Sequence, residues 1–147
     1  MFYLYSFFII YFFQQIRKNL HALHNRLQEL LTLETNIILL SGDDASAAEF
    51  MLAGGHGVIS VSANVVPHVI KQLCNVASKG DVAATQVLDQ SLTALNQALF
   101  VESNPIPVKW MLNKMGRIQS GIRLPLLPLN QVFHEKTINE MIKLKLI

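Results

Sequence analysis

Two strand-like segments stand out along the chain, at residues 36–41 and 57–62. The first is an apolar run without polar alternation, a pattern typical of parallel strands that are covered on both faces. The second, GVISVS, is rich in the β-branched residues that favour strands. Between them, residues 45–53 predict a short helix, and Gly54-Gly55 follows in the position where glycine commonly ends a helix. A strand, a helix and a strand in about thirty residues predict one βαβ unit with parallel strands.

Helical periodicity accounts for most of the remaining chain. Leucines at three- and four-residue steps in residues 15–33 predict a helix with one apolar face. Four further helices are expected at residues 65–78, 81–100, 108–115 and 131–146. Asn64 is the predicted cap of the first of these, and Pro67 lies in its first turn. The predicted apolar stripe of helix 81–100 is Val87, Leu88, Leu92, Leu95 and Leu99. Two proline-containing segments, 102–107 and 123–130, are expected to lack helix, and no strand is predicted after residue 64.

The first thirteen residues, MFYLYSFFIIYFF, differ from the rest in composition. They hold eight of the twelve aromatic residues and all three tyrosines. The run is shorter than the about twenty apolar residues that a transmembrane helix needs, and it lacks the basic start and small-residue end of a signal peptide. We favour a segment foreign to the fold, either a chance translation or a replacement for a lost strand, and keep a membrane-associated anchor as the alternative.

Charge and cysteine content narrow the function classes. The formal net charge is +2, and the longest basic cluster is Arg17-Lys18, which argues against a nucleic-acid partner. The single cysteine, Cys74, excludes an internal disulfide and suits a reducing cytosol. It is predicted to be an inert thiol, since no basic residue stands beside it. The five histidines show no metal-binding spacing apart from His21 and His24, three residues apart on the predicted helix 15–33, which we interpret as part of its solvated polar face. Neither a metal nor a cofactor is expected.

Candidate chemistry lies at the carboxyl ends of the two strands, where ligands meet α/β folds. The loop after the first strand is Gly42-Asp43-Asp44. The two aspartates could form a carboxylate pair, but we favour a structural role, in which Asp44 caps the next helix and Asp43 holds the turn. His56, which lies between glycines, is likewise interpreted as structural. These glycines precede a strand rather than a helix, which argues against a dinucleotide site.

Two strands alone leave two open edges and too little apolar cover, which indicates part of a larger sheet. Three segments carry a specific resemblance: LLSGDDASAAEFMLAGGHGVISVSANV at 39–65, FVESNPIPVKWML at 100–112 and RLPLLPL at 123–129. In these segments the sequence resembles the carboxyl-terminal half of the dihydrodipicolinate synthase (4-hydroxy-tetrahydrodipicolinate synthase) family.

The resemblance implies an α/β fold that is the last part of a (β/α)8 TIM barrel. Residues 15–80 would supply its last two strands and their helices, as an incomplete barrel. Residues 81–147 would form the helical carboxyl-terminal extension, and residues 1–14 would match nothing in the family. Family members condense pyruvate with aspartate semialdehyde on the path to lysine, through a Schiff base on a strand-six lysine.

The same resemblance assigns substrate contacts and predicts a loss of activity. Ile59 carries over as a pyruvate contact, and Gly42 is a second, weaker candidate. The strand that should carry the Schiff-base lysine is replaced by residues 7–13, FFIIYFF, which contain none. Lys18 lies on the predicted polar face of its helix and is not expected to replace that lysine. No catalytic residue is therefore assigned.

The leading hypothesis is a cytoplasmic, truncated family member that is inactive alone, with pyruvate binding weak or lost. Because these barrels commonly form tetramers, the first alternative is a homo-oligomer, or a non-catalytic subunit or inhibitor that binds a full-length synthase. The second alternative is a small membrane-tethered protein held by residues 1–13.

Overall fold

The computed structural model describes residues 20–32 and 38–147. In chain order the elements are α1 (Leu20–Thr32), β1 (Leu40–Ser41), the 3₁₀ turn η1 (Asp44–Ser46), α2 (Ala47–Leu52), β2 (Gly57–Val58), η2 (Ser62–Asn64), α3 (Pro67–Ala77), α4 (Val82–Leu99), α5 (Ile106–Lys114), η3 (Gln131–Phe133) and α6 (His134–Lys143). The predictions made for residues 1–14 and for Lys18 lie outside the described residues, as do those for the first part of helix 15–33 and the start of the first strand.

The two strands pair in parallel, as predicted, with Leu40 opposite Gly57 and Ser41 opposite Val58. Each strand is only two residues long, shorter than the six predicted. The pairing ends because the chain turns away just after β2. The backbone N–H of Ile59 still donates to the Ser41 carbonyl (2.8 Å), but that of Val61 donates to the Asp44 carboxylate. Within the described residues no further strand follows, as the sequence predicted.

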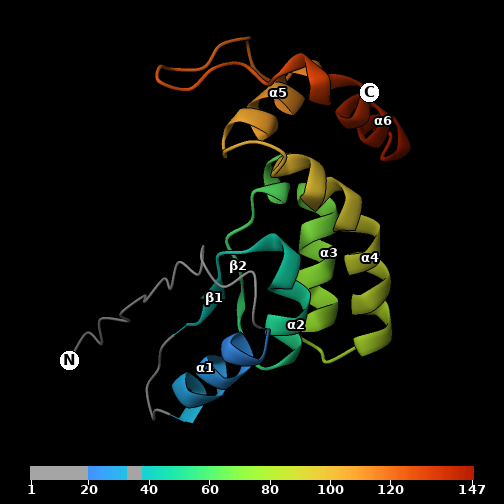
Figure 1. Cartoon of the computed structure of the whole chain (residues 1–147). Coiled ribbons are helices and arrows are strands. Elements are labelled where there is room, and N and C mark those ends of the chain that lie inside the picture. Colours follow the sequence, from blue (N-terminus) through green and yellow to red (C-terminus); the bar gives the residue numbers. More distant parts are fainter. Residues whose placement is uncertain (1–19, 33–37) are drawn as a thin grey trace, which may run out of the picture.

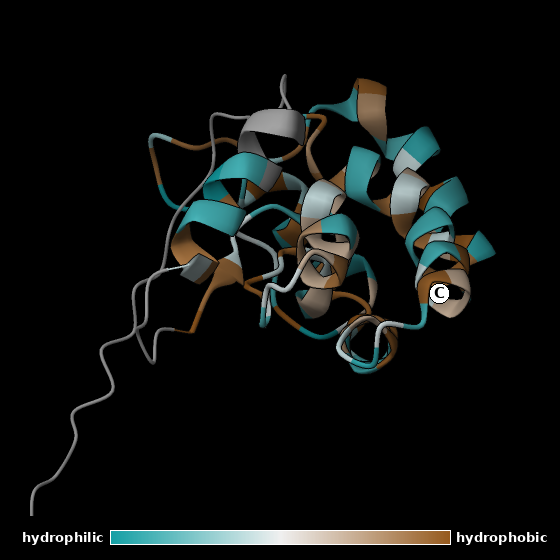
Figure 2. Ribbon diagram, turned by 90° about the horizontal axis from the view of Figure 1, so that it is seen from below, coloured by the Kyte–Doolittle hydropathy of each residue, from teal (hydrophilic) through white to brown (hydrophobic). Residues whose placement is uncertain are grey.

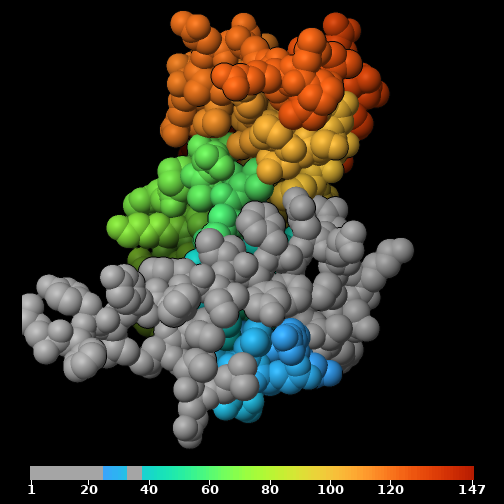
Figure 3. All heavy atoms as spheres, turned by 90° about the vertical axis from the view of Figure 1, so that its left-hand side faces the viewer, coloured from blue at the N-terminus to red at the C-terminus, as the bar shows by residue number. Residues whose placement is uncertain are grey.

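Helices α2, α3 and α4 stand on one side of the strands, α1 lies toward one end of them, and α5 and α6 lie toward the other end (Figure 1). The antiparallel pair α3 and α4 packs beside α2, while α5 and α6 lie across the end of α4 at which the strands also finish. In the space-filling view this carboxyl-terminal part, orange and red, forms a layer at one end of the molecule (Figure 3). The helical extension that follows α3 therefore reaches the strand ends.

The core is centred on α4, which begins where Asp81 caps its first turn by accepting from the backbone N–H of Ala84. Its fully buried residues pack against side chains from α3, α5 and α6, and the helices show distinct hydrophobic and hydrophilic sides (Figure 2). The central members of this core are Leu73, Leu92, Leu95, Leu99, Met111 and Met141. Burial of this kind is the dominant favourable term in folding. Because α4 packs against α3 as well as against α5 and α6, it links the strand region to the extension.

The predicted glycine turn between α2 and β2 is confirmed. Gly54 has a φ of 107°, a conformation that side chains rarely adopt. A β-carbon on Gly55 would lie 2.2 Å from Cε1 of Phe50, so only glycine fits there. This close approach packs Phe50 of α2 against the turn that leads into β2.

Two predictions about the helices are wrong. Asn64 does not cap α3, which begins after Val66 without a side-chain cap. Instead, Asn64 Nδ2 donates to the Val61 carbonyl (3.0 Å), so the chain makes a 3₁₀ turn before Pro67 starts the helix. Val87 does not face the core of α4 but is 68% exposed.

The helix boundaries also shift slightly. The helix around Trp110 begins at Ile106, two residues earlier than predicted, with Pro107 in its first turn. The last predicted helix is the short turn η3 followed by α6, which ends at Lys143. No helix among residues 20–32 and 38–147 combines the length and the hydropathy needed to span a bilayer.

Candidate functional site

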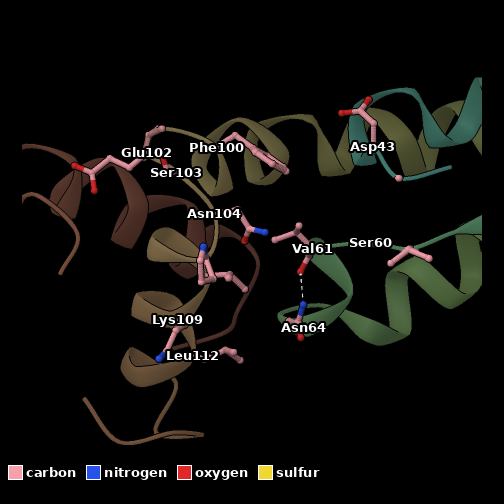
Figure 4. A pocket seen from close by; sticks show the side chains of 15 residues that line it. Asp43, Ser60, Val61, Asn64, Phe100, Glu102, Ser103, Asn104, Lys109 and Leu112 are labelled. Atoms are coloured by element: carbon pink, nitrogen blue, oxygen red, sulfur yellow. Dashed lines mark hydrogen bonds between the residues drawn. The ribbon is translucent and has the colours of Figure 1, made fainter. Parts of the chain in front are cut away.

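An open cavity of about 940 Å³ lies where β1 and β2 end (Figure 4). One wall comes from the residues that follow the two strands, and the opposite wall comes from the segment between α4 and α5 and from α5 itself. The lining residues are Gly42, Asp43, Ile59, Ser60, Val61, Asn64, Phe100, Val101, Glu102, Ser103, Asn104, Pro105, Val108, Lys109 and Leu112. The carboxyl ends of parallel strands are where ligands meet α/β folds, so this cavity is the candidate site.

The structure brings Gly42 and Ile59, the two predicted substrate contacts, to the same wall of this cavity. Gly42 directly follows β1, and Ile59 directly follows β2. The hydrogen bond from the Ile59 backbone N–H to the Ser41 carbonyl holds these two positions at adjacent strand ends. The Ile59 side chain is 43% exposed. Their role in substrate binding stays a prediction.

The two neighbouring aspartates each bind elsewhere rather than forming a carboxylate pair, and the cap predicted for Asp44 is made by Asp43 instead. Asp43 is the helix cap: its Oδ2 accepts from the backbone N–H (3.0 Å) and hydroxyl (2.7 Å) of Ser46. Asp44 points the other way and is buried. Its Oδ2 accepts from the backbone N–H groups of Val61 (2.8 Å) and Ser62 (3.2 Å), while its buried Oδ1 has no partner among the described residues. Asp44 therefore joins the loop after β1 to the loop after β2.

His56 has the structural role that the sequence suggested. Its Nδ1 accepts from the backbone N–H of Leu39 (3.0 Å), and its own backbone N–H donates to the Leu39 carbonyl (2.8 Å). The ring thus extends the hydrogen bonding of the strand pair by one residue before β1. It lies at the end of the strands opposite the cavity.

Sequence reasoning missed the second wall of the cavity. From sequence, residues 102–107 indicate only a break between helices, yet this segment and the first turns of α5 face the strand ends across the cavity. The signal available was the proline pair at Pro105 and Pro107, which fixes a rigid turn. That this turn meets residues some forty positions earlier depends on how α4 packs, which no local pattern reveals.

Among the described residues, the lysine that lines this cavity is Lys109. In Figure 4 its side chain extends from α5 away from Val61 and Asn64. No group of three metal-ligating side chains occurs in the part of the chain that the structure describes. Burial raises the pKa of the Cys74 thiol, which lowers its reactive thiolate fraction and agrees with an inert cysteine.

A second cavity of about 410 Å³ lies on the other side of Asp43 and Phe100, which line both cavities. It borders α4, from which Asp89 and Asn96 line it. Burial raises the pKa of Asp89, and the negative charge of Glu49 on α2 raises it further. The folded chain therefore holds the Asp89 proton more tightly than the unfolded chain does.

Replacing Asp89 by asparagine is expected to stabilise the fold at pH 7. A raised carboxyl pKa favours the folded state below the ordinary aspartate pKa of about 4, and this advantage is lost as the pH rises through the raised value. An asparagine side chain cannot ionise and so avoids this loss. The expected gain in the free energy of unfolding is less than about 1 kcal/mol, because solvent screens a half-exposed charge. The measurement is the melting temperature of both chains between pH 4 and pH 8.

The gain from Asp89→Asn should shrink as the pH falls toward 4. Glu49→Gln removes only the lesser cause and should give a smaller gain in the same direction. A variant that is less stable than the parent chain at pH 7 would show that Asp89 is stabilised in its charged form, which contradicts the assigned burial effect.

Comparison with known proteins identifies one family with which this chain shares most of its sequence. A model of the dihydrodipicolinate synthetase family matches residues 14–144. The chain is 48% identical over 118 residues to the 4-hydroxy-tetrahydrodipicolinate synthase of Teredinibacter turnerae, covering 80% of this chain and 40% of that protein. It is 54% identical over 102 residues to the synthase of Methylococcus capsulatus, covering 69% and 35%. The matched region is the carboxyl-terminal part of these relatives.

Solved structures similar to this chain belong to the same family. The dihydrodipicolinate synthase of Acinetobacter baumannii complexed with pyruvate is similar with a TM-score of 0.78 and 40% identity, covering 82% of this chain and 42% of that one. The synthase of Aquifex aeolicus is similar with a TM-score of 0.80 and 34% identity, covering 84% and 42%. The chain thus spans about two fifths of the length of the relatives it matches.

Proposed function

Because the chain belongs to the dihydrodipicolinate synthetase family, we propose that it supplies one side of a pyruvate-binding site and does not catalyse the family reaction alone. In this proposal residues 15–80 are the last part of a (β/α)8 barrel, residues 81–147 are its helical extension, and residues 1–14 are foreign to the fold. The chain acts in the cytoplasm. Gly42 and Ile59 are the pyruvate contacts.

The observation that carries the proposal is the convergence of Gly42 and Ile59 on one cavity wall. They come from the carboxyl ends of adjacent parallel strands, where barrel enzymes hold their substrates. A similar solved structure was obtained as a complex with pyruvate. The exposed Ile59 side chain offers an apolar contact for the methyl group of a small keto acid, and Gly42 lets backbone approach the ligand closely.

The proposed inactivity rests on the lysine that the chemistry needs. A Schiff base forms when a neutral lysine amine attacks the keto carbon, with loss of water. Lys109, half-buried on α5, borders the cavity but extends away from Val61 on the strand-end wall (Figure 4). The described residues therefore provide a binding surface for the keto acid without an amine directed at it.

One experiment tests both parts of this proposal. A chain labelled at its isoleucine methyl groups is titrated with pyruvate and then reduced with borohydride. We expect the Ile59 resonance to shift while that of Ile142, exposed on α6, stays in place. We expect no stable adduct, whereas reduction of a lysine Schiff base with pyruvate would add about 72 Da to the intact mass.

The control is a full-length family synthase treated in parallel, which should gain the adduct. A stoichiometric adduct on this chain, abolished by Lys109→Arg, would overturn the proposed inactivity. An Ile59 signal that does not move at any pyruvate concentration would overturn the proposed binding site.

One observation favours a second candidate, a subunit that binds a full-length synthase. Parallel strands are normally covered on both faces, yet Ile38, just before β1, and Leu31, on α1, are 38% and 39% exposed. Such a surface suits contact with another family barrel or a second copy of this chain. Co-purification of a tagged chain with a synthase would support this candidate, and a chain that sediments alone in its presence would contradict it.

A further inference from the structure

Three buried polar residues form a connected hydrogen-bond network behind the residues that line the larger cavity. Asp44, which follows β1, accepts from the backbone N–H of Ser62 in η2. The Ser62 hydroxyl in turn donates to Oδ1 of Asn96 on α4 (2.6 Å). These residues are 5%, 0% and 7% exposed, respectively. This buried polar network runs from the strand ends to the helical extension, and none of its members lines the larger cavity.

The network joins the elements that carry the two cavity walls. Asp44 lies two residues after Gly42, and it also holds the backbone N–H of Val61 on the strand-end wall. At the other end, Asn96 precedes Phe100, where the second wall begins, by four residues, or about one helical turn. Fixing Asn96 on α4 therefore fixes where the segment from Phe100 onward leaves the helix.

Apolar packing alone does not explain a polar network at this place. Leu92, Leu95 and Leu99 on α4 already bury their side chains fully in the core. Hydrophobic burial is non-directional, whereas the hydrogen bond of 2.6 Å between Ser62 and Asn96 restricts both distance and angle. Polar groups in a core bring a desolvation cost that apolar residues avoid. What this network adds is a defined position of one wall relative to the other.

We propose that Asp44, Ser62 and Asn96 are positioning residues that set the separation of the two walls of the pyruvate site. This inference rests on the proposed function, because the cavity matters only if a ligand binds there. The network touches no ligand itself. It acts by holding Gly42, Ile59 and Val61 at a fixed distance from the wall formed by residues 100–112.

The test separates position from stability. Ser62→Ala alone removes the donor, and Asn96→Leu alone leaves the Ser62 hydroxyl unpaired. The double variant replaces both partners by apolar groups, which can be nearly neutral for stability. Spin labels at Ala45→Cys, in η1 next to the strand-end wall, and at Ser103→Cys, on the opposite wall, report the distance between the two sides of the cavity in a Cys74→Ala background. Both positions are exposed. The matched control is Ser91→Ala, which removes an exposed hydroxyl from α4, the helix that also carries Asn96.

We expect the double variant to melt near the parent chain but to show a broader distance distribution between the two labels. We also expect the pyruvate concentration that shifts the Ile59 methyl signal to rise about tenfold, the change that one lost buried hydrogen bond can produce. The Ser91→Ala control should leave both readouts unchanged. A double variant whose distance distribution is as narrow as that of the parent would overturn the inference.

The outcomes also distinguish this inference from the proposed function. If pyruvate does not shift Ile59 even in the parent chain, the binding site is wrong, and the label distances alone decide whether the network positions the walls. If pyruvate binds the parent and the double variant equally, with unchanged distances, the network is only a structural link.

Discussion

Replacing Leu95 by alanine is expected to lower the free energy of unfolding by about 3 kcal/mol, within the range for a leucine-to-alanine change in a packed core. Leu95 is fully buried in the carboxyl-terminal half of α4. The core cluster that contains Leu95 also holds buried residues of α3, α5 and α6, so we expect the cavity left behind not to collapse easily. Chemical denaturation followed by circular dichroism measures the change, since α4 is the longest helix described.

The matched control is Val87→Ala on the same helix. Val87 is 68% exposed, so its truncation should change the free energy of unfolding by no more than about 0.5 kcal/mol. The sequence assigned Val87 and Leu95 to the same apolar stripe, whereas the structure separates them. Equal losses for the two variants would mean that α4 packs with Val87 inward, which contradicts the observed rotation of the helix.

The misplacement of Val87 shows what helical periodicity can and cannot decide. Leu88, Leu92, Leu95 and Leu99 follow the three- and four-residue steps that keep residues on one face. Val87 neighbours Leu88 in the sequence and therefore lies about 100° away around the helix. The same face also buries two polar residues, Thr85 and Asn96. Hydrophobicity alone counts Val87 as core and leaves these two out.

More of the fold was predictable where the signal is local. The apolar runs, the double glycine and the prolines indicated the βαβ unit, its parallel pairing and most helix positions, because each depends on neighbouring residues. The strand lengths were overestimated because pairing stops where Asp44 captures the Val61 N–H. That bond joins residues seventeen positions apart, and no local pattern encodes it.

In the candidate site, too, one wall was predictable from local sequence and the other was not. Gly42 and Ile59 were identifiable because both directly follow strands, and parallel strands finish at one edge of a sheet. The opposite wall, from Phe100 to Leu112, was not identifiable because its place depends on the packing of α4 against α3 and α2. The family resemblance implied contacts only for the strand-end wall. The structure adds the second wall and the buried polar network beneath it.

Asp44→Ala is expected to cost about 3 kcal/mol of unfolding free energy, since it leaves the backbone N–H groups of Val61 and Ser62 without their acceptor. A buried donor that loses its partner costs about 1–3 kcal/mol. The Ser62 N–H is the more deeply placed of the two, in a residue that is 0% exposed. Urea denaturation of the variant and the parent chain measures the loss.

Asp43→Ala tests the assignment of the two neighbours directly. Asp43 caps η1 through Ser46, and loss of a cap costs about 1 kcal/mol. The interpretation from sequence gave Asp44 only a cap, which would limit its loss to about 1 kcal/mol. A loss for Asp44→Ala no larger than that for Asp43→Ala would therefore remove Asp44 from the network proposed to position the cavity walls.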